Sequence, residues 1–279
     1  MNAGHLIKKS TLVAALACVG SLAAVPTVAH AQTDNPDAWK YTAIIYGYFP
    51  DIGGSTKFPQ SGGGSSVTIN SDAVLDSLNF AFMGTFEATK GRWGILADVL
   101  YMDLSNSVNK TRDLTFNGQP LPAGVTANAD LGLRGTVFEL AGVYKAFGDS
   151  KSNVDFVAGA RMLDIQSSLT LELSADIGND TGPGRSHTTS VHPTYWDVVV
   201  GAKGQYRFGS NGEWSIPWYV DVGTGESKLT YQALAGIAYG FKWGQVIGAW
   251  RYLDYDFKSG SDLESINFNG PMVGVAFNW

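Results

Sequence analysis

The sequence predicts an all-β protein that forms a closed antiparallel transmembrane β-barrel of about ten strands, with eight strands as the alternative. Three observations support this fold class. The last segment, residues 270–279, alternates between an apolar face and a face of small or polar side chains, as a strand does. Similar segments recur along the chain, and the connections between them alternate between short and long. The 34 glycines and 12% aromatic residues suit many short strands with glycine-rich turns.

The final strand organises the expected fold. An edge strand presents unpaired backbone groups, so it must pair with an earlier strand. We expect it to close the barrel against the strand near Trp39. Its apolar face consists of Val273, Val275, Phe277 and Trp279.

The N-terminus predicts a cleaved secretory signal peptide over residues 1–31, followed by a barrel over residues 32–279. Lys8 and Lys9 precede an apolar run, and Ala29-His30-Ala31 has the small-x-small form of a cleavage site. The apolar run is short for a span of about 20 residues, which disfavours the alternative of an anchoring helix.

Cys18 is the single cysteine of the chain. Lipidation at Cys18 is a further alternative, although the residues before it do not match the usual lipoprotein pattern. After removal of the leader no cysteine remains, so we expect no disulfide, no thiolate metal site and no thiol catalysis.

The charge of the chain bears on its partners. The formal net charge is −6 and becomes more negative without Lys8 and Lys9, which argues against a nucleic-acid partner. The mature sequence contains no uninterrupted apolar run of about 20 residues, so transmembrane helices are not expected.

Ten segments carry the period-two alternation of strands. The connections after the second, fourth, sixth and eighth segments are short. The connections expected over residues 50–77, 105–128 and 167–193 are long loops, the first with a helical turn near residues 69–78. In chain order the segments are residues 39–49, 78–88, 93–103, 133–146, a segment from 154, 196–208, 214–222, 229–243, 245–257 and 270–279.

Two features favour a bilayer over a soluble periplasmic sandwich. Aromatic residues cluster where strands meet the short turns, as in an interfacial girdle. The opposite face of the strands is rich in Gly, Ala and Ser, whereas a fully solvated face would carry more charge. The girdle candidates are Phe86, Trp93, Tyr144, Phe156, Phe208, Trp214, Phe241, Trp243, Phe277 and Trp279.

With its leader, its ten alternating segments and its terminal Val-Gly-Val-Ala-Phe-Asn-Trp, the chain resembles Gram-negative outer-membrane β-barrel proteins, among them small OmpA-like and porin-like barrels. The resemblance implies an outer-membrane location, short periplasmic turns and long extracellular loops. It also implies outer-membrane lipid and the barrel-insertion machinery as partners. The machinery would read the terminal strand through Val273, Val275, Phe277 and Trp279.

Charged residues of both signs fall on the inward faces of different strands. We expect them to meet as an ion-pair network, because an isolated buried charge costs several kcal/mol. They either fill the lumen or form a selective constriction. Barrels of about eight strands are filled by side chains, so any pore through about ten strands should be small. The residues are Glu87, Asp98, Glu139, Arg161, Lys203, Asp221 and Arg251.

Catalysis is the rival class of function. After residue 31 the histidines are His187 and His192, with Asp176 and Asp180 nearby. A His–carboxylate pair could act as a general base, as in the omptin proteases, but the paired aspartates of omptins and a Ser-His esterase arrangement are not found. Two imidazoles on a loop make a weak metal site, so no metal or other cofactor is expected.

The sequence therefore predicts a non-enzymatic outer-membrane barrel. It would act as a narrow pore or as a structural and surface-interaction protein, with small solutes or surface ligands meeting its outer loops. The alternative is an omptin-like protease or a lipid esterase that acts at the extracellular rim.

Overall fold

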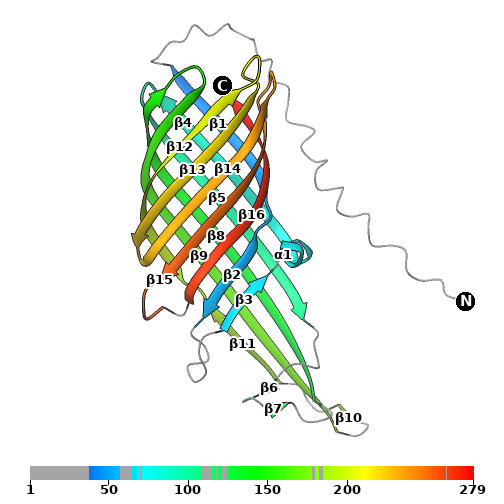
Figure 1. Cartoon of the computed structure of the whole chain (residues 1–279). Coiled ribbons are helices and arrows are strands. Elements are labelled where there is room, and N and C mark those ends of the chain that lie inside the picture. The colour runs from blue at the N-terminus through cyan, green and yellow to red at the C-terminus, as the bar shows by residue number, and fades with distance from the viewer. Residues whose placement is uncertain are drawn as a thin grey trace, which may run out of the picture. The chain divides into compact units, whose positions relative to one another are not determined.

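The structure, a computed structural model, describes residues 38–56, 65–69, 71–108, 115–116, 119–120, 125–177, 180–181, 185–261 and 263–279. Ten long antiparallel strands build the wall of a barrel (Figure 1). They are β1 (Trp39–Tyr48), β4 (Leu78–Lys90), β5 (Trp93–Val108), β8 (Val125–Gly148), β9 (Ser152–Ile177), β12 (Thr194–Phe208), β13 (Trp214–Gly225), β14 (Ser227–Gly240), β15 (Gln245–Phe257) and β16 (Leu263–Asn278).

The barrel closes through its first and last strands. β16 pairs with β1 from Thr42↔Asn278 to Tyr48↔Met272, which confirms the predicted closure near Trp39. The ten-stranded prediction is confirmed, and the eight-stranded alternative is wrong. Among the described residues, no helix is long and apolar enough to cross a membrane.

Shorter elements accompany the wall. β2 continues β1 beyond Pro50 and pairs with the first part of β16, so β1 and β2 together act as one barrel strand. The helical turn predicted near residues 69–78 is present as α1. The shorter elements are β2 (Asp51–Thr56), β3 (Ser65–Ile69), α1 (Ser71–Ser77), β6 (Thr115–Phe116), β7 (Gln119–Pro120), β10 (Asp180–Thr181) and β11 (Arg185–Val191).

Parts of the three predicted long loops are strands, so those loop boundaries were wrong. β2 and β3 lie within residues 50–77, and β16 begins at Leu263 instead of residue 270. β5 runs on to Val108 and pairs there with β8, while β9 continues to Ile177 and pairs with β8 and β11. Polar residues in these segments suggested loops. A strand ladder, however, is made by backbone groups and forms equally well where both faces are polar.

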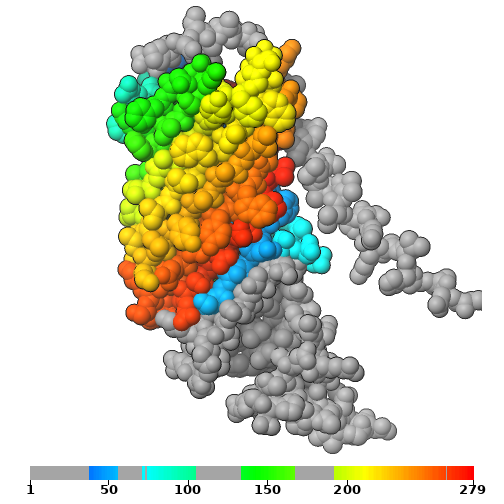
Figure 2. Space-filling view, viewed as in Figure 1, coloured from blue at the N-terminus to red at the C-terminus, as the bar shows by residue number. Residues whose placement is uncertain are grey.

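The outer surface of the barrel carries an apolar belt. On β12, Val198 and Val200 are 66% and 53% exposed, whereas the intervening Val199 is 0% exposed. Rings meet one another at the short-turn end, for example Trp93 with Tyr144 at 4.8 Å between ring centroids. Figure 2 shows the side chains of β12 to β16 as a continuous outer wall. Exposed apolar side chains flanked by aromatic rings are the surface that a bilayer requires of a barrel.

Local hydrogen bonds and glycines stabilise the short turns between strands. In the turn between β8 and β9, the backbone N–H groups of Ser152 and Lys151 donate to Asp149 Oδ1 at 2.7 Å each. These hydrogen bonds lower the pKa of the Asp149 carboxyl. Between β12 and β13, Gly209 and Gly212 adopt φ values of +96° and +70°, which favour glycine.

The seam between β1 and β4 is not hydrogen-bonded along its full length. β1 pairs with β4 from Trp39↔Lys90 only to Ile45↔Gly84. Beyond Gly84, the described part of β4 pairs with β5 alone. There α1 contacts both β2 and β5, and Asp51 Oδ1 accepts a hydrogen bond from the Ser71 amide at 2.6 Å. The helix therefore covers the seam from the side of β2.

Candidate functional site

The barrel interior gathers the charged residues that the sequence singled out. Each of the seven sits on a different strand and is buried or partly buried. They form three groups, around Arg251, around Arg161 and around Lys203. Every one of the seven takes part in at least one ion pair.

The Arg251 group is closed by hydrogen bonds. The guanidinium Nη2 lies 2.9 Å from Asp98 Oδ2 and donates to Gln232 Oε1 at 2.7 Å. Its Nη1 donates to the Tyr46 hydroxyl at 2.8 Å, and that hydroxyl donates to Asp98 Oδ1 at 2.9 Å. The guanidinium also lies over the rings of Tyr46 and Tyr48, at 6.0 and 5.8 Å from the ring centroids. One cation and one carboxylate thus balance each other inside the barrel.

The Arg161 group holds two carboxylates on one guanidinium. Arg161 is 0% exposed and donates to Glu139 Oε2 through Nη2 at 2.7 Å and through Nε at 3.1 Å. The same Nη2 binds Asp221. The Tyr219 hydroxyl donates to Glu139 Oε1. Buried ionised groups need such multiple hydrogen bonds to offset their desolvation.

The Lys203 group is less buried. Lys203 Nζ lies 2.6 Å from Glu87 Oε2 and 3.6 Å from Asp155 Oδ2. The side chains of Lys203 and Glu87 are 18% and 16% exposed. Lys145 Nζ donates to Thr89 Oγ1 at 3.0 Å nearby. Water therefore reaches the lumen from the end that carries the short turns.

An apolar cluster fills the lumen toward the other end. The ring centroids of Tyr195 and Phe257 lie 4.3 Å apart in this cluster. Leu163 and Leu253 are 0% exposed. These buried side chains occupy the lumen at this level. Its buried members are Tyr46, Tyr48, Ile52, Val74, Met83, Leu100, Met102, Leu104, Val137, Leu163, Ile165, Leu253, Tyr255, Phe257, Ile266, Phe268 and Met272.

The two histidines occupy different surroundings. His187 lies on β11, opposite Leu171 of β9, and not in a loop as predicted. His192 Nε2 lies 3.1 Å from Asp164 Oδ1, and the Thr194 hydroxyl donates to Asp164 Oδ2 at 2.7 Å. Partial burial raises the pKa of Asp164, but the hydrogen bonds from Thr194 and His192 outweigh it and lower the pKa overall.

The carboxylate that binds His192 is Asp164, which the sequence did not predict, and the side chains of Asp176 and Asp180 lie outside the described part of the structure. In the described part of the chain, the imidazole and the Thr194 hydroxyl both bind Asp164. Nucleophilic catalysis instead needs the hydroxyl to bind the imidazole.

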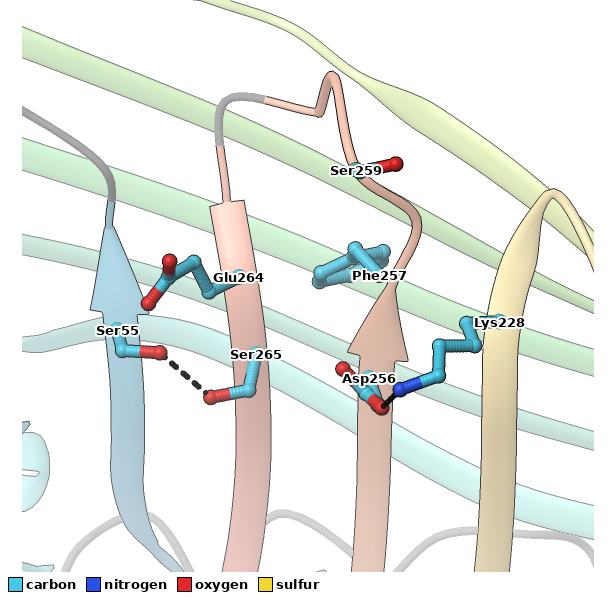
Figure 3. A pocket seen from close by; sticks show the side chains of 7 residues that line it. All are labelled: Ser55, Lys228, Asp256, Phe257, Ser259, Glu264 and Ser265. Atoms are coloured by element: carbon cyan, nitrogen blue, oxygen red, sulfur yellow. Dashed lines mark hydrogen bonds and ion pairs between the residues drawn. The ribbon is translucent and has the colours of Figure 1, made fainter. Parts of the chain in front are cut away.

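A cavity of about 560 Å³ lies at the long-connection end, where β2, β14, β15 and β16 run side by side (Figure 3). Three serine hydroxyls, two carboxylates and one ammonium surround it. Lys228 Nζ lies 2.9 Å from Asp256 Oδ2, and the Ser55 and Ser265 hydroxyls are 2.9 Å apart. The lining residues are Ser55, Lys228, Asp256, Phe257, Ser259, Glu264 and Ser265.

Solved structures share this architecture. The outer membrane protease OmpT from Escherichia coli is similar with a TM-score of 0.51 and 12% identity, over 87% of this chain and 97% of that one. The chain has the fold of a Gram-negative outer-membrane β-barrel protein. At this identity the likeness extends to the outer-membrane barrel fold alone.

Other outer-membrane barrels are similar at a lower level. The transport unit of the Escherichia coli autotransporter AIDA-I has a TM-score of 0.36 at 9% identity, over 90% of this chain and 94% of that one. The Pseudomonas putida toluene transporter TodX has a TM-score of 0.29 at 10% identity, over 87% and 90% of the two chains. No protein-family model and no curated protein matches the chain.

The sequence did not predict several lumen residues of this outer-membrane barrel. Tyr46, Tyr219 and Gln232 are uncharged, and their role depends on partners from distant strands. Asp155 could have been found, because it lies on the same face of β9 as Arg161 by the period of two.

Proposed function

We propose that this outer-membrane barrel is a closed structural barrel that carries a surface-interaction sheet on its outer side. The observation that carries the proposal is the filling of the lumen. The apolar cluster around Leu163, Leu253 and Phe257 lies on the extracellular side of the buried Arg251 and Arg161 groups. Ion passage through such a tube would require charged side chains to separate and apolar ones to part.

The length of two strands supports the surface role. A barrel strand needs roughly 9–11 residues to cross the bilayer, whereas β8 and β9 have 24 and 26 residues. They stay paired as far as Val125↔Ala175. Together with the ends of β5 and β11 they form a sheet that continues past the barrel, away from the C-terminus (Figure 1). We assign this sheet to the cell exterior, because the long connections of such barrels face outward.

Planar-bilayer recordings of the refolded protein test the closed barrel. We expect no conductance steps from the unaltered protein and steps from a Leu253→Ala/Phe257→Ala variant that thins the apolar cluster. A Val200→Ala/Val222→Ala variant, altered on the lipid-facing side, serves as the matched control and should stay silent. Discrete steps from the unaltered protein, with an ion preference that changes on Lys203→Glu, would show a narrow pore instead.

The narrow pore is the second candidate, and the partial exposure of Lys203 and Glu87 favours it. The enzymatic alternative draws only on the contact between His192 and Asp164 at the rim. A protease and esterase screen of refolded protein, with and without His187→Ala and His192→Ala, tests it. Activity that both substitutions leave intact would exclude these histidines as its source.

A further inference from the structure

Of the residues that line the cavity in Figure 3, Phe257 belongs to the lumen cluster, whereas the other six lie outside that cluster. Asp256 and Ser265 pair across β15 and β16, and Ser265 pairs with Ser55 of β2. Their neighbours Tyr255 and Ile266 are buried in the lumen cluster, so these three side chains point outward by the period of two. The cavity is therefore reached from outside, whether or not the barrel conducts.

The cavity lies beyond the apolar belt. On the same outward face of β15, Trp250 donates its indole N–H to Asn269 at 2.8 Å, and Tyr252 donates to Asp254 at 3.0 Å. Rings with a polar handle mark the level where a bilayer gives way to water. The polar residues that follow, among them Asp256, thus lie on the aqueous side of that level.

Its polar groups are free to bind a ligand. The Lys228–Asp256 pair is exposed, with side chains 68% and 42% exposed, so it contributes little and can exchange partners. The Ser55 and Ser265 hydroxyls each have acceptor and donor capacity beyond their mutual hydrogen bond. Within the described residues, the Glu264 carboxylate and the Ser259 hydroxyl have no hydrogen-bond or ion-pair partner.

The charge and size of the cavity narrow the class of ligand. Two carboxylates face one ammonium, so the walls carry one net negative charge and disfavour phosphates and other anions. Three hydroxyls and two carboxylates offer many hydrogen bonds, with Phe257 as an apolar part of the lining. The volume of about 560 Å³ falls in the range of small-molecule sites.

We propose that this cavity binds a sugar residue and favours a sugar that carries an ammonium group. The serine hydroxyls and Asp256 bind the ligand hydroxyls, and Glu264 binds the ammonium. The proposal goes beyond the closed barrel and stands apart from it, because no lumen residue other than Phe257 contributes.

Titration calorimetry of the full refolded protein tests the proposal, with glucosamine, glucose and glucose 6-phosphate as probes. We expect glucosamine to bind more tightly than glucose, and glucose 6-phosphate to bind more weakly than either. Glu264→Gln should weaken glucosamine binding about tenfold, the value of one charge-assisted hydrogen bond, and leave glucose binding unchanged. Ser265→Ala should weaken the binding of both glucosamine and glucose.

Glu226→Gln is the matched control, since Glu226 lies at the same end of the barrel but binds the Trp196 amide and does not line the cavity. Binding in this variant should equal that of the unaltered protein. The absence of glucosamine binding, or equal loss in Glu264→Gln and Glu226→Gln, would overturn the proposal. Circular dichroism confirms that each variant is folded.

A second experiment distinguishes whether the bound sugar is a glycolipid head group or a free sugar. The protein is placed in nanodiscs that contain either a glycolipid with a glucosamine head group or the same lipid without the sugar. If the glycolipid is the source, its presence in the nanodisc should abolish the binding of free glucosamine. Glu264→Gln should then lower the enrichment of the glycolipid around the barrel. If the free sugar is the source, glucosamine binding should be the same in both nanodiscs.

Discussion

The Tyr48 amide donates its hydrogen bond to the Met83 thioether at 3.2 Å, where a neighbouring strand would ordinarily supply a carbonyl. A thioether is a weak acceptor. The contact lies where β1 and β4 stop pairing, just past Ile45↔Gly84. Beside this seam α1 contacts β2 and β5, and no β1–β4 ladder continues there among the described residues.

Amide hydrogen exchange should reveal the seam. We expect the Tyr48 amide to exchange faster than that of Ile44, which lies within the β1–β4 ladder. Asp51→Ala should speed exchange within α1, because it removes the acceptor of the Ser71 amide, a loss of about 1 kcal/mol for a helix N-cap. Asp72→Ala, a change on the exposed face of the same helix, is the control. Equal protection of the Tyr48 and Ile44 amides from exchange would mean that the β1–β4 ladder continues past Ile45.

Removing one partner of the Arg251–Asp98 pair should destabilise the protein more than removing both charges. Arg251→Met leaves Asp98 buried without its cation, and we expect the free energy of unfolding to fall by about 3–5 kcal/mol. Arg251→Met/Asp98→Asn should recover most of that loss. Denaturant unfolding in detergent micelles measures both. Lys228→Met, which breaks an exposed pair, should cost less than about 1 kcal/mol. A loss as small for Arg251→Met would show that the lumen is wet at this level.

The turn at Asp149 should make stability depend on pH. Its pKa is lowered in the folded protein, so the ionised carboxylate stabilises the fold above the unfolded pKa, about 3.9. That contribution is lost as the pH falls through the folded value. Unfolding midpoints of the unaltered protein and of Asp149→Ala should therefore differ at pH 7 and converge in strong acid. A difference that is independent of pH would assign the effect to the turn backbone.

The sidedness of the barrel can be tested with single cysteines, because Cys18 is the single cysteine of the chain and lies in the predicted leader. Lys258→Cys, exposed in the connection between β15 and β16, should react with a membrane-impermeant maleimide on intact cells. Ser210→Cys, in the short turn between β12 and β13, should react only after the outer membrane is permeabilised. The reverse pattern would invert the orientation.

The sequence predicted the parts of this fold that depend on the period of two. That period places all seven charged residues, among them Arg161 and Arg251, on inward faces without knowledge of any neighbour. It cannot predict which charges meet, because the partner of each side chain is set by the register between strands and by closure of β16 on β1. The pairing of Arg161 with both Glu139 and Asp221 therefore needed the structure.

Other parts were missed for a different reason. The polar extensions of β8 and β9 looked like loops, since side-chain polarity carries the loop signal whereas backbone pairing makes the strand. The cavity beside Glu264 combines residues 256–265 with Ser55 and Lys228, which come from distant parts of the chain. No local pattern marks such a site.

In this barrel, one face of each strand meets lipid and the other meets a packed interior. Spin labels placed singly at Val198, Val199 and Val200 in a reconstituted bilayer test it most directly. We expect high oxygen collision rates at positions 198 and 200, and a low rate with an immobilised label at position 199. Uniform exposure to a water-soluble relaxation agent at all three positions would contradict it.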